Sequence, residues 1–406
     1  MTEQKFSTGV PDQPILQATE FDPEDEYRPE PEPEPQPPSW MDGRVRIGIH
    51  TSIAGSYLNA LESARKLGCN ALQIFSASPR MWQGGSRISD VDAQAFRARR
   101  EELRLGPLVI HASYLLNLAS AERMLQTRSI QAFHDEIVRA IALRADFLIV
   151  HPGARGESTT EQAISTIVES VKQASKHAPM DGLRILIENT AGMGTTVGAR
   201  LEELGEILAG LRNLPVGACL DTAHLFAAGY DIKSPGGLAS TIGQIDGAIG
   251  LENVPVMHVN DSKIPLGGRV DRHAHIGKGK IGAEAFARIL RHPRFGAAAP
   301  EGLPGRAFVA ETPIDDPGDD RRNVAMLWEL AGLKGQEPEA EKGFSMLTAA
   351  LQKRISLHRK TEKKRNAKRE TLRSARGRRR TSRRSEKKSR TKKGGARKGS
   401  AKENRG

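Results

Sequence analysis

Six residues of the kinds that bind metal ions stand at or near the ends of short apolar runs. Five runs end directly on such a residue, and a further run places His258 two residues before Asn260-Asp261. The six residues are His111, His151, Glu188, Asp221, His258 and Glu311. Imidazole and carboxylate are the ligands that Zn²⁺, Mn²⁺ and Fe²⁺ accept. A lone histidine at such a position is usually structural. Six ligand-type residues at the ends of six runs favour a metal site.

Two local pairs add further candidate ligands. Asp221-Thr-Ala-His224 puts a carboxylate and an imidazole three residues apart, and Asp271-Arg-His273 lies in a predicted loop after His258. One ion takes about three or four protein ligands, so nine candidates suggest two or three ions that share a carboxylate. Clustered ions suit phosphoryl chemistry, because one acidifies a water while others neutralise the transition state and the leaving oxygen. His50 also follows such a run, but we expect it to support the ligands rather than to bind metal.

A repeating pattern of apolar runs and amphipathic segments must position these residues. The β-rich runs are Arg46–His50, Ala71–Phe75, Leu108–His111, Phe147–His151, Arg184–Glu188, Gly217–Asp221, Val256–His258 and Ala307–Glu311. Helical periodicity fills the segments between them, as in SYLNALESARKLG and FHDEIVRAIALRA. Eight such units predict an α/β protein with a (β/α)₈ TIM barrel, whose strands end at one functional face. An open doubly wound sheet is the alternative, disfavoured because no glycine-rich phosphate loop follows the first run.

The two ends of the chain differ from the middle in charge. Residues 1–43 are Pro-rich and hold eleven acids against Lys5 and Arg28, whereas residues 353–406 hold twenty-five Lys or Arg against four Glu. The net charge of +12 therefore belongs to the tail, and the middle is formally neutral. Such biased segments rarely build a core. We predict a disordered acidic head (1–43), a barrel domain (44–335) and a mostly disordered basic tail (336–406), in which GFSMLTAALQKRISLHRK could form one helix.

Cysteine use and hydropathy restrict the compartment. Cys69 and Cys219 are too few for a disulfide framework and lie in apolar surroundings, so we expect two core thiols in a reducing environment. The acidic N-terminus lacks the pattern of a signal peptide, and nothing approaches the roughly 18 apolar residues of a membrane span. These features favour a soluble intracellular protein, cytoplasmic and nucleoid-associated in a bacterium. We also expect the protein to be a monomer. In a eukaryote, the cluster RGRRRTSRR could direct it to the nucleus.

An ordered set of motifs between residues 48 and 313 resembles the endonuclease IV family. The motifs are GIHTSIAGS, ASPRMW, HASYLLNLAS, HPGA, IENTAGMG, DTAHLFAAGYD, HVNDSK, DRHAHIGKGKIG and ETP. The resemblance implies a (β/α)₈ barrel with three zinc ions. It also implies a DNA-repair activity on double-stranded DNA with abasic sites or blocked 3′ ends, cleaving 5′ to the abasic site and leaving a 3′-hydroxyl. The acidic head and the basic tail fall outside the resemblance.

The resemblance also assigns the nine ligands to three zinc ions. It implies His111, His151 and a bridging Glu188 for the first zinc, Asp221, His258 and Glu311 for the second, and His224, Asp271 and His273 for the third. By the same resemblance, Glu188 links the two ions that generate the nucleophile, and the third ion stabilises the departing 3′ oxygen. All nine positions carry the expected residue types.

Three further residues match positions that the family uses to enter the duplex: Arg80, Tyr114 and Leu115. A wedge of one cation and two largely apolar groups can replace lost stacking, and an abasic site is the least costly to extrude. Core packing is the alternative for Tyr114 and Leu115. Ala223, Met193 and Ser78 replace the Cys, Gln and Asn common in relatives, which affects substrate contacts but no ligand.

Two other functions compete with this interpretation. Sugar isomerases and epimerases of the xylose-isomerase-like barrels also carry strand-end ligands, usually for one or two metals, and the third set around His224 argues against them. A nucleic-acid-binding protein with a degenerate barrel is disfavoured by the intact ligand set. The basic tail still predicts salt-sensitive, non-specific nucleic-acid binding, with simple solubility as its alternative.

Overall fold

The computed structural model describes residues 45–82, 87–180, 182–296, 306–336 and 338. Nearly all of this part corresponds to the predicted barrel domain. The acidic head, most of the basic tail and the helix predicted within it lie outside the described residues, so those predictions remain untested.

Eight short parallel strands form the centre of the described structure. They are β1 (Arg46–Ile49), β2 (Leu72–Phe75), β3 (Leu108–His111), β4 (Phe147–Val150), β5 (Arg184–Glu188), β6 (Val216–Asp221), β7 (Val256–His258) and β10 (Ala307–Ala310). Their order is β1-β10-β7-β6-β5-β4-β3-β2, so the first strand, β1, and the second strand, β2, occupy the two ends of the ladder. This order is that of a TIM barrel and confirms the predicted fold class.

The seam between β1 and β2 closes the barrel with few hydrogen bonds. A single parallel bridge joins His50 to Gln73, and the backbone N–H of Thr51 donates to the carbonyl of Gln73 at 2.8 Å. The two strands approach closely at Gly48, where a Cβ atom would lie 2.7 Å from the carbonyl oxygen of Ala71. Glycine is therefore needed at this point of the seam. Because β1 and β2 meet along this seam, the open doubly wound sheet is ruled out.

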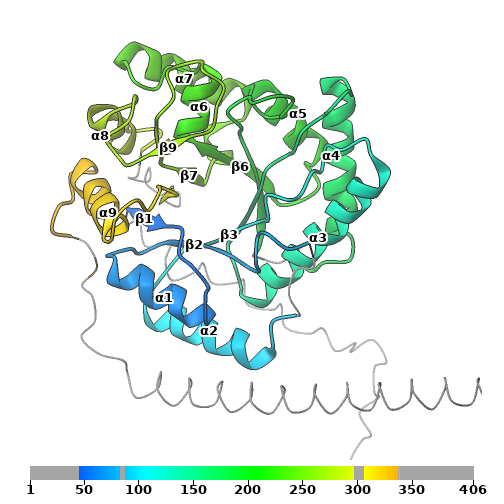
Figure 1. Cartoon of the computed structure of the whole chain (residues 1–406), viewed down its shortest axis with the longest axis horizontal. Coiled ribbons are helices and arrows are strands. Elements are labelled where there is room, and N and C mark those ends of the chain that lie inside the picture. The colour runs from blue at the N-terminus through cyan, green and yellow to red at the C-terminus, as the bar shows by residue number, and fades with distance from the viewer. Residues whose placement is uncertain (1–44, 83–86, 181, 297–305, 337, 339–406) are drawn as a thin grey trace, which may run out of the picture. The chain divides into compact units, whose positions relative to one another are not determined.

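Helices surround the strands on the outside of the barrel (Figure 1). In the described part they are α1 (Tyr57–Lys66), α2 (Asp90–Glu102), α3 (Arg123–Ala142), α4 (Thr160–Ser175), α5 (Leu201–Gly210), α6 (Thr222–Ala228), α7 (Pro235–Ala248), α8 (Ala283–Leu290) and α9 (Asp319–Leu330), with a 3₁₀ turn η1 (Leu251–Asn253). Side-chain N-caps start several of them, including Ser56 on α1, Ser89 on α2 and the Thr159–Gln162 capping box on α4. None of the described helices is long and apolar enough to cross a bilayer.

The predicted strands agree with the structure to within one residue at each end. His50, His151 and Glu311 were predicted as terminal strand residues but lie one position beyond the strands. The loop that carries His273 differs more. We predicted it as irregular, yet His273 begins β9 (His273–Ala274), which pairs antiparallel with β8 (Asp261–Ser262). Two-residue strands are too short to produce a recognisable period in sequence.

The two faces of the strands bury separate apolar clusters, because alternate side chains point to opposite faces. The cluster inside the barrel comprises Val109, Phe147, Ile149, Leu186, Cys219, Val256, Ala307 and Val309. The alternate residues, such as Ile110, Leu148 and Ile187, join the larger cluster that packs against the helices. Both cysteines are buried and free, Cys219 inside the barrel and Cys69 in the outer cluster, as predicted.

Candidate metal centre

Each of the six strand-end ligands follows an interior apolar residue by two positions. The pairs are Val109 and His111, Ile149 and His151, Leu186 and Glu188, Cys219 and Asp221, Val256 and His258, and Val309 and Glu311. Since side chains alternate along a strand, the ligands continue the inward-facing row and close the carboxyl-terminal end of the barrel core. The alternation that fills the core thus also gathers the polar centre.

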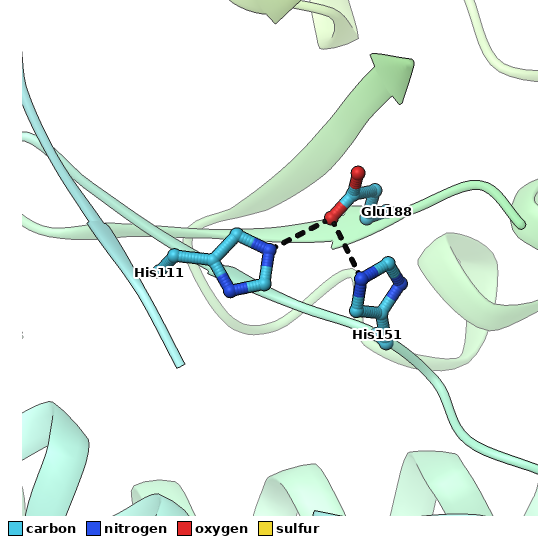
Figure 2. Close-up of side chains that lie close together, drawn as sticks. All are labelled: His111, His151 and Glu188. Carbon is cyan, nitrogen blue, oxygen red and sulfur yellow. Dashed lines mark hydrogen bonds and ion pairs between the residues drawn. The ribbon is translucent and has the colours of Figure 1, made fainter. Parts of the chain in front are cut away.

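The first group of ligands joins β3, β4 and β5 through the carboxylate of Glu188. Its Oε2 atom lies 3.0 Å from Nε2 of His111 and 3.3 Å from Nε2 of His151, as Figure 2 shows. Glu188 and His111 are buried, whereas the His151 side chain is 32% exposed. Solvent therefore reaches this group from the His151 side.

The second group uses the other oxygen of the same carboxylate. Oε1 of Glu188 lies 2.8 Å from Nδ1 of His258, which also lies 3.3 Å from Oε2 of Glu311. Asp221 is the register neighbour of His258 across β6 and β7 and completes this group. Glu188 thus faces one group with each oxygen, which is the arrangement needed to bridge two ions.

The third group gathers around the start of α6. Asp271 touches both histidines, with Oδ2 at 3.2 Å from Nε2 of His224 and Oδ1 at 3.1 Å from Nε2 of His273. The Oδ2 atom of Asp221 lies 3.6 Å from the same His273 nitrogen, so Asp221 belongs to the second and third groups alike. We predicted Asp221 as a ligand of the second ion alone, and its position beside the third group as well was not predicted.

Backbone carbonyls hold the outer nitrogens of three ligand histidines. Nδ1 of His111 donates to Ala112 O at 2.7 Å, Nδ1 of His224 to Asn189 O at 2.9 Å, and Nδ1 of His273 to Glu311 O at 3.1 Å. A carbonyl only accepts, so Nδ1 carries the proton and Nε2 is the nitrogen left for a metal. The imidazoles are therefore oriented before any ion binds.

Burial and charge oppose one another throughout the centre. Burial disfavours a charged His111, but the hydrogen bond and charge of Glu188 outweigh it and raise the pKa of His111 to about 9. At His273 burial is likewise outweighed, by Asp221 and Asp271, which raises its pKa to about 9. Burial would raise the pKa of Glu188, yet His151 and His258 hold it well below its usual range. At His151 burial prevails and lowers the pKa.

The donor set fits divalent cations. Ligand atoms lie within 4.8 Å of one another in each of three sets: His111, His151 and Glu188; Glu188, Asp221, His258 and Glu311; and Asp221, His224 and His273. The Nε2 atom of His273 is buried and makes no hydrogen bond to any described residue, although it lies beside two carboxylates. Buried ionised groups are stabilised when they are paired or bind metals, and a cation between these carboxylates and imidazoles would do so.

Amide side chains that the sequence interpretation missed support the ligands. The Nδ2 group of Asn260 donates to Asp221 Oδ2 at 2.6 Å, and its Oδ1 accepts from the backbone N–H of Glu311 at 2.7 Å. Gln73, in the middle of β2, donates to Glu311 and contacts His50. His50 itself lies 3.7 Å from Glu311 Oε1, in the supporting position expected for it. Gln73 could have been recognised in the sequence as a supporting residue, because it is a polar residue inside an otherwise apolar strand.

The three predicted DNA-contact residues lie on two adjoining loops beyond β2 and β3. Arg80 is exposed, and the hydroxyl of Ser113 donates to Pro79 O at 2.8 Å, which ties the loops together. Tyr114 is 54% exposed and meets Phe75 edge to face, at 6.4 Å between ring centroids. Tyr114 is therefore not a core residue. Leu115 is half-buried.

Comparison with known proteins agrees with this geometry. The family model described as "Xylose isomerase-like TIM barrel" matches residues 61–330. A "Probable endonuclease 4" from Solibacter usitatus (strain Ellin6076) is 48% identical over 294 residues, which cover 71% of this chain and 98% of the relative. The chain belongs to the endonuclease IV family. The crystal structure of endonuclease IV from Thermus thermophilus is 39% identical with a TM-score of 0.61, over 71% of this chain and 99% of that one.

Membership of the endonuclease IV family makes the chain a DNA-cleaving hydrolase. The sugar-enzyme alternative finds support in the fold alone. A D-tagatose 3-epimerase-like protein covers 72% of this chain with a TM-score of 0.53, but only 18% of the residues are identical. The endonuclease IV relatives share far more sequence over the same part of the chain.

Proposed function

We propose that this endonuclease IV relative is a repair enzyme of the base-excision pathway that incises double-stranded DNA at abasic sites. In this proposal the enzyme hydrolyses the phosphodiester 5′ to the lesion and leaves a 3′-hydroxyl, which also suits removal of blocked 3′ ends, and its ligand groups would hold three zinc ions. The observation that carries the proposal is the shared carboxylate of Glu188, whose two oxygens face different ligand groups. A single-metal isomerase has no use for such sharing.

The ligands would divide among three ions. His111, His151 and Glu188 would hold one, and Glu188, Asp221, His258 and Glu311 a second. His224, Asp271 and His273 would hold the third, with Asp221 beside it. When bound, divalent ions supply Lewis acidity, which lowers the pKa of water and neutralises charge on a phosphodiester.

The protein would position the reaction through its graded burial. Glu188 and His258 are completely buried, so their geometry is fixed by the surrounding core. His151 and Asp271 are partly exposed, with 32% and 45% of their side chains accessible, and border the open side of the centre. A phosphodiester would therefore approach from that side, over ligands already held by backbone carbonyls.

Arg80, Tyr114 and Leu115 would act in substrate recognition. Their loops are tied together by Ser113 and Pro79, and the Phe75 ring packs edge to face with both the Tyr114 ring and the His111 ring. Arg80 and Tyr114 are free to meet a duplex, and an exposed aromatic ring can occupy the gap that an extruded abasic nucleotide leaves. The basic tail would add non-specific attraction to DNA and retain a monomeric enzyme at the nucleoid or in the nucleus.

The decisive experiment is incision of a duplex with a single tetrahydrofuran site, compared with the same duplex without the lesion. We expect cleavage 5′ to the lesion, loss of activity after treatment with a chelator, and recovery on adding zinc. Metal analysis of the recovered protein should find about three zinc ions per chain if the ligand assignment holds. A zinc-loaded, folded protein that leaves the lesion intact would refute the proposed function.

A further inference from the structure

Gln73 is a fully buried polar side chain in an otherwise apolar strand, and the reaction proposed above leaves it without a role. Its neighbours in β2, Leu72 and Ile74, belong to the cluster that packs against the helices, so Gln73 points to the inside of the barrel. Burying a primary amide is unfavourable unless its polar atoms are hydrogen-bonded. The partners of Gln73 therefore indicate why the residue is there.

The Gln73 amide joins the ends of three other strands. Its Oε1 atom lies 2.8 Å from Nε2 of His258, at the end of β7. Its Nε2 atom donates to Oε1 of Glu311, just beyond β10, at 2.5 Å, and lies 3.0 Å from Nδ1 of His50, just beyond β1. Only the NH₂ group can face a carboxylate favourably, so Glu311 fixes the direction of the amide and turns its oxygen to His258.

This direction decides which nitrogen of His258 carries a proton. The Gln73 oxygen can only accept, so Nε2 of His258 must donate, and Nδ1 is the nitrogen left to face Glu188 at 2.8 Å and Glu311 at 3.3 Å. His111, His224 and His273 are oriented the opposite way round, by backbone carbonyls on Nδ1. Among these four ligand histidines, the orientation of His258 depends on a side chain that substitution can remove.

We propose that Gln73 is a positioning residue for the ion of the second group, the one held by Glu188, Asp221, His258 and Glu311. The amide sets the His258 tautomer with its oxygen and holds Glu311 in place with its nitrogen. One side chain thereby prepares two ligands of the same ion, and His50 completes its hydrogen bonding. The inference rests on the metal centre of the proposed function.

Zinc titration of the full chain tests this role without DNA. Gln73→Met keeps the length of the side chain and removes both hydrogen-bonding ends. Loss of a partner that orients a metal ligand weakens metal affinity by roughly 10- to 100-fold. We therefore expect one zinc-binding step to weaken by this factor in competition with a chelator, while the remaining steps keep their affinity.

Histidine NMR gives a second readout that a merely structural residue would not change. Long-range ¹H–¹⁵N spectra of the zinc-loaded protein should show His258 protonated at Nε2, and in Gln73→Met this proton should shift upfield and exchange faster with water, because its hydrogen-bond acceptor is gone. Gln73→Glu separates the two roles, because a carboxylate still accepts from His258 but repels Glu311. It should keep the tautomer and lose affinity, and being isosteric it serves as the affinity test if Gln73→Met does not fold.

Asn70→Ala is the matched control. Asn70 is also a buried amide, placed just before β2 at the opposite end of the barrel, where it bonds the backbone of Val45 and Ile47. We expect it to lower Tm without changing zinc affinity. Equal weakening of all zinc steps in step with Tm, or unchanged affinity in a folded Gln73 variant, would overturn the role of Gln73. Failure to incise abasic DNA would instead refute the proposed function.

Discussion

The carboxylate of Asp221 accepts a hydrogen bond from the backbone N–H of His224 at 3.0 Å, so a candidate metal ligand is also the N-cap of α6. The same carboxylate accepts from Asn260 at 2.6 Å through its other oxygen. Asp221 therefore has a structural role and a ligand role that different substitutions should separate.

Asp221→Asn and Asp221→Ala should both reduce zinc content, but they should differ in stability. Asparagine keeps a capping oxygen, although its NH₂ group would oppose that of Asn260, whereas alanine removes the cap as well. Loss of an N-cap costs about 1 kcal/mol, so Asp221→Ala should be the less stable variant by roughly that amount. Denaturant unfolding of the two metal-free variants measures the difference. Equal stability would show that the cap is unimportant.

Glu188→Gln should abolish incision while the barrel stays folded. The amide keeps the volume of the buried side chain but removes the charge that faces His111 on one side and His258 on the other. The expected loss is several orders of magnitude, the scale of removing a metal-activated water. Initial rates on a tetrahydrofuran duplex give the result, with circular dichroism as the folding control. Near-normal rates would contradict the assignment of Glu188 as the bridging ligand.

Tyr114→Ala should weaken binding to abasic duplex more than to intact duplex. The exposed ring can fill space only where a nucleotide has left the stack, so its removal matters most at the lesion. Leu115→Ala should behave alike if Leu115 shares the wedge. Fluorescence anisotropy with both duplexes makes the comparison, and zinc content should be unchanged. An equal loss on both duplexes would identify these side chains as packing residues.

Zinc binding should release more protons at pH 7 than at pH 10. The pKa values of His111 and His273 in the metal-free protein are raised to about 9, so both are protonated at pH 7 and must lose a proton to bind an ion. Above pH 9 they are already neutral, which also means that zinc affinity rises with pH over this interval. Calorimetry in buffers of different ionisation enthalpy counts the protons. A proton release independent of pH would contradict the assignment.

Deleting residues 353–406 should flatten the salt dependence of DNA binding. This segment carries twenty-five Lys or Arg and four Glu, and each phosphate contact made by a cation releases counterions. Single-turnover incision at saturating enzyme should change little, because the ligands lie elsewhere. The slope of log affinity against log salt on undamaged DNA decides between the outcomes. Coinciding slopes for the full and shortened chains would mean that the tail does not touch DNA.

Both the barrel and the metal ligands at its end could be predicted from the sequence, because the two-residue alternation of the strands determines both. Alternation in the strands places Leu186 inside the barrel and, two residues later, Glu188 at its end, so a strand-end ligand is visible in the sequence. The supporting residues are less visible. Asp261 stands beside the ligands, yet its carboxylate accepts from the backbone of Gly279, Ile281 and Gly282 instead. Which carboxylate meets a neighbour and which meets its own loop depends on the fold of residues 262–282, for which the sequence has no periodic pattern.

The graded burial of the three ligand groups has a kinetic consequence. The apolar layer of Val109, Leu186 and Val256 closes the centre from below, and the second group, with His258 and Asp221 inaccessible to solvent, lies against that floor. The groups that include His151 and Asp271 border the open side. We therefore expect ions to enter and leave from this open side of the described residues, with the ion of the second group loading first and being the last that a chelator removes.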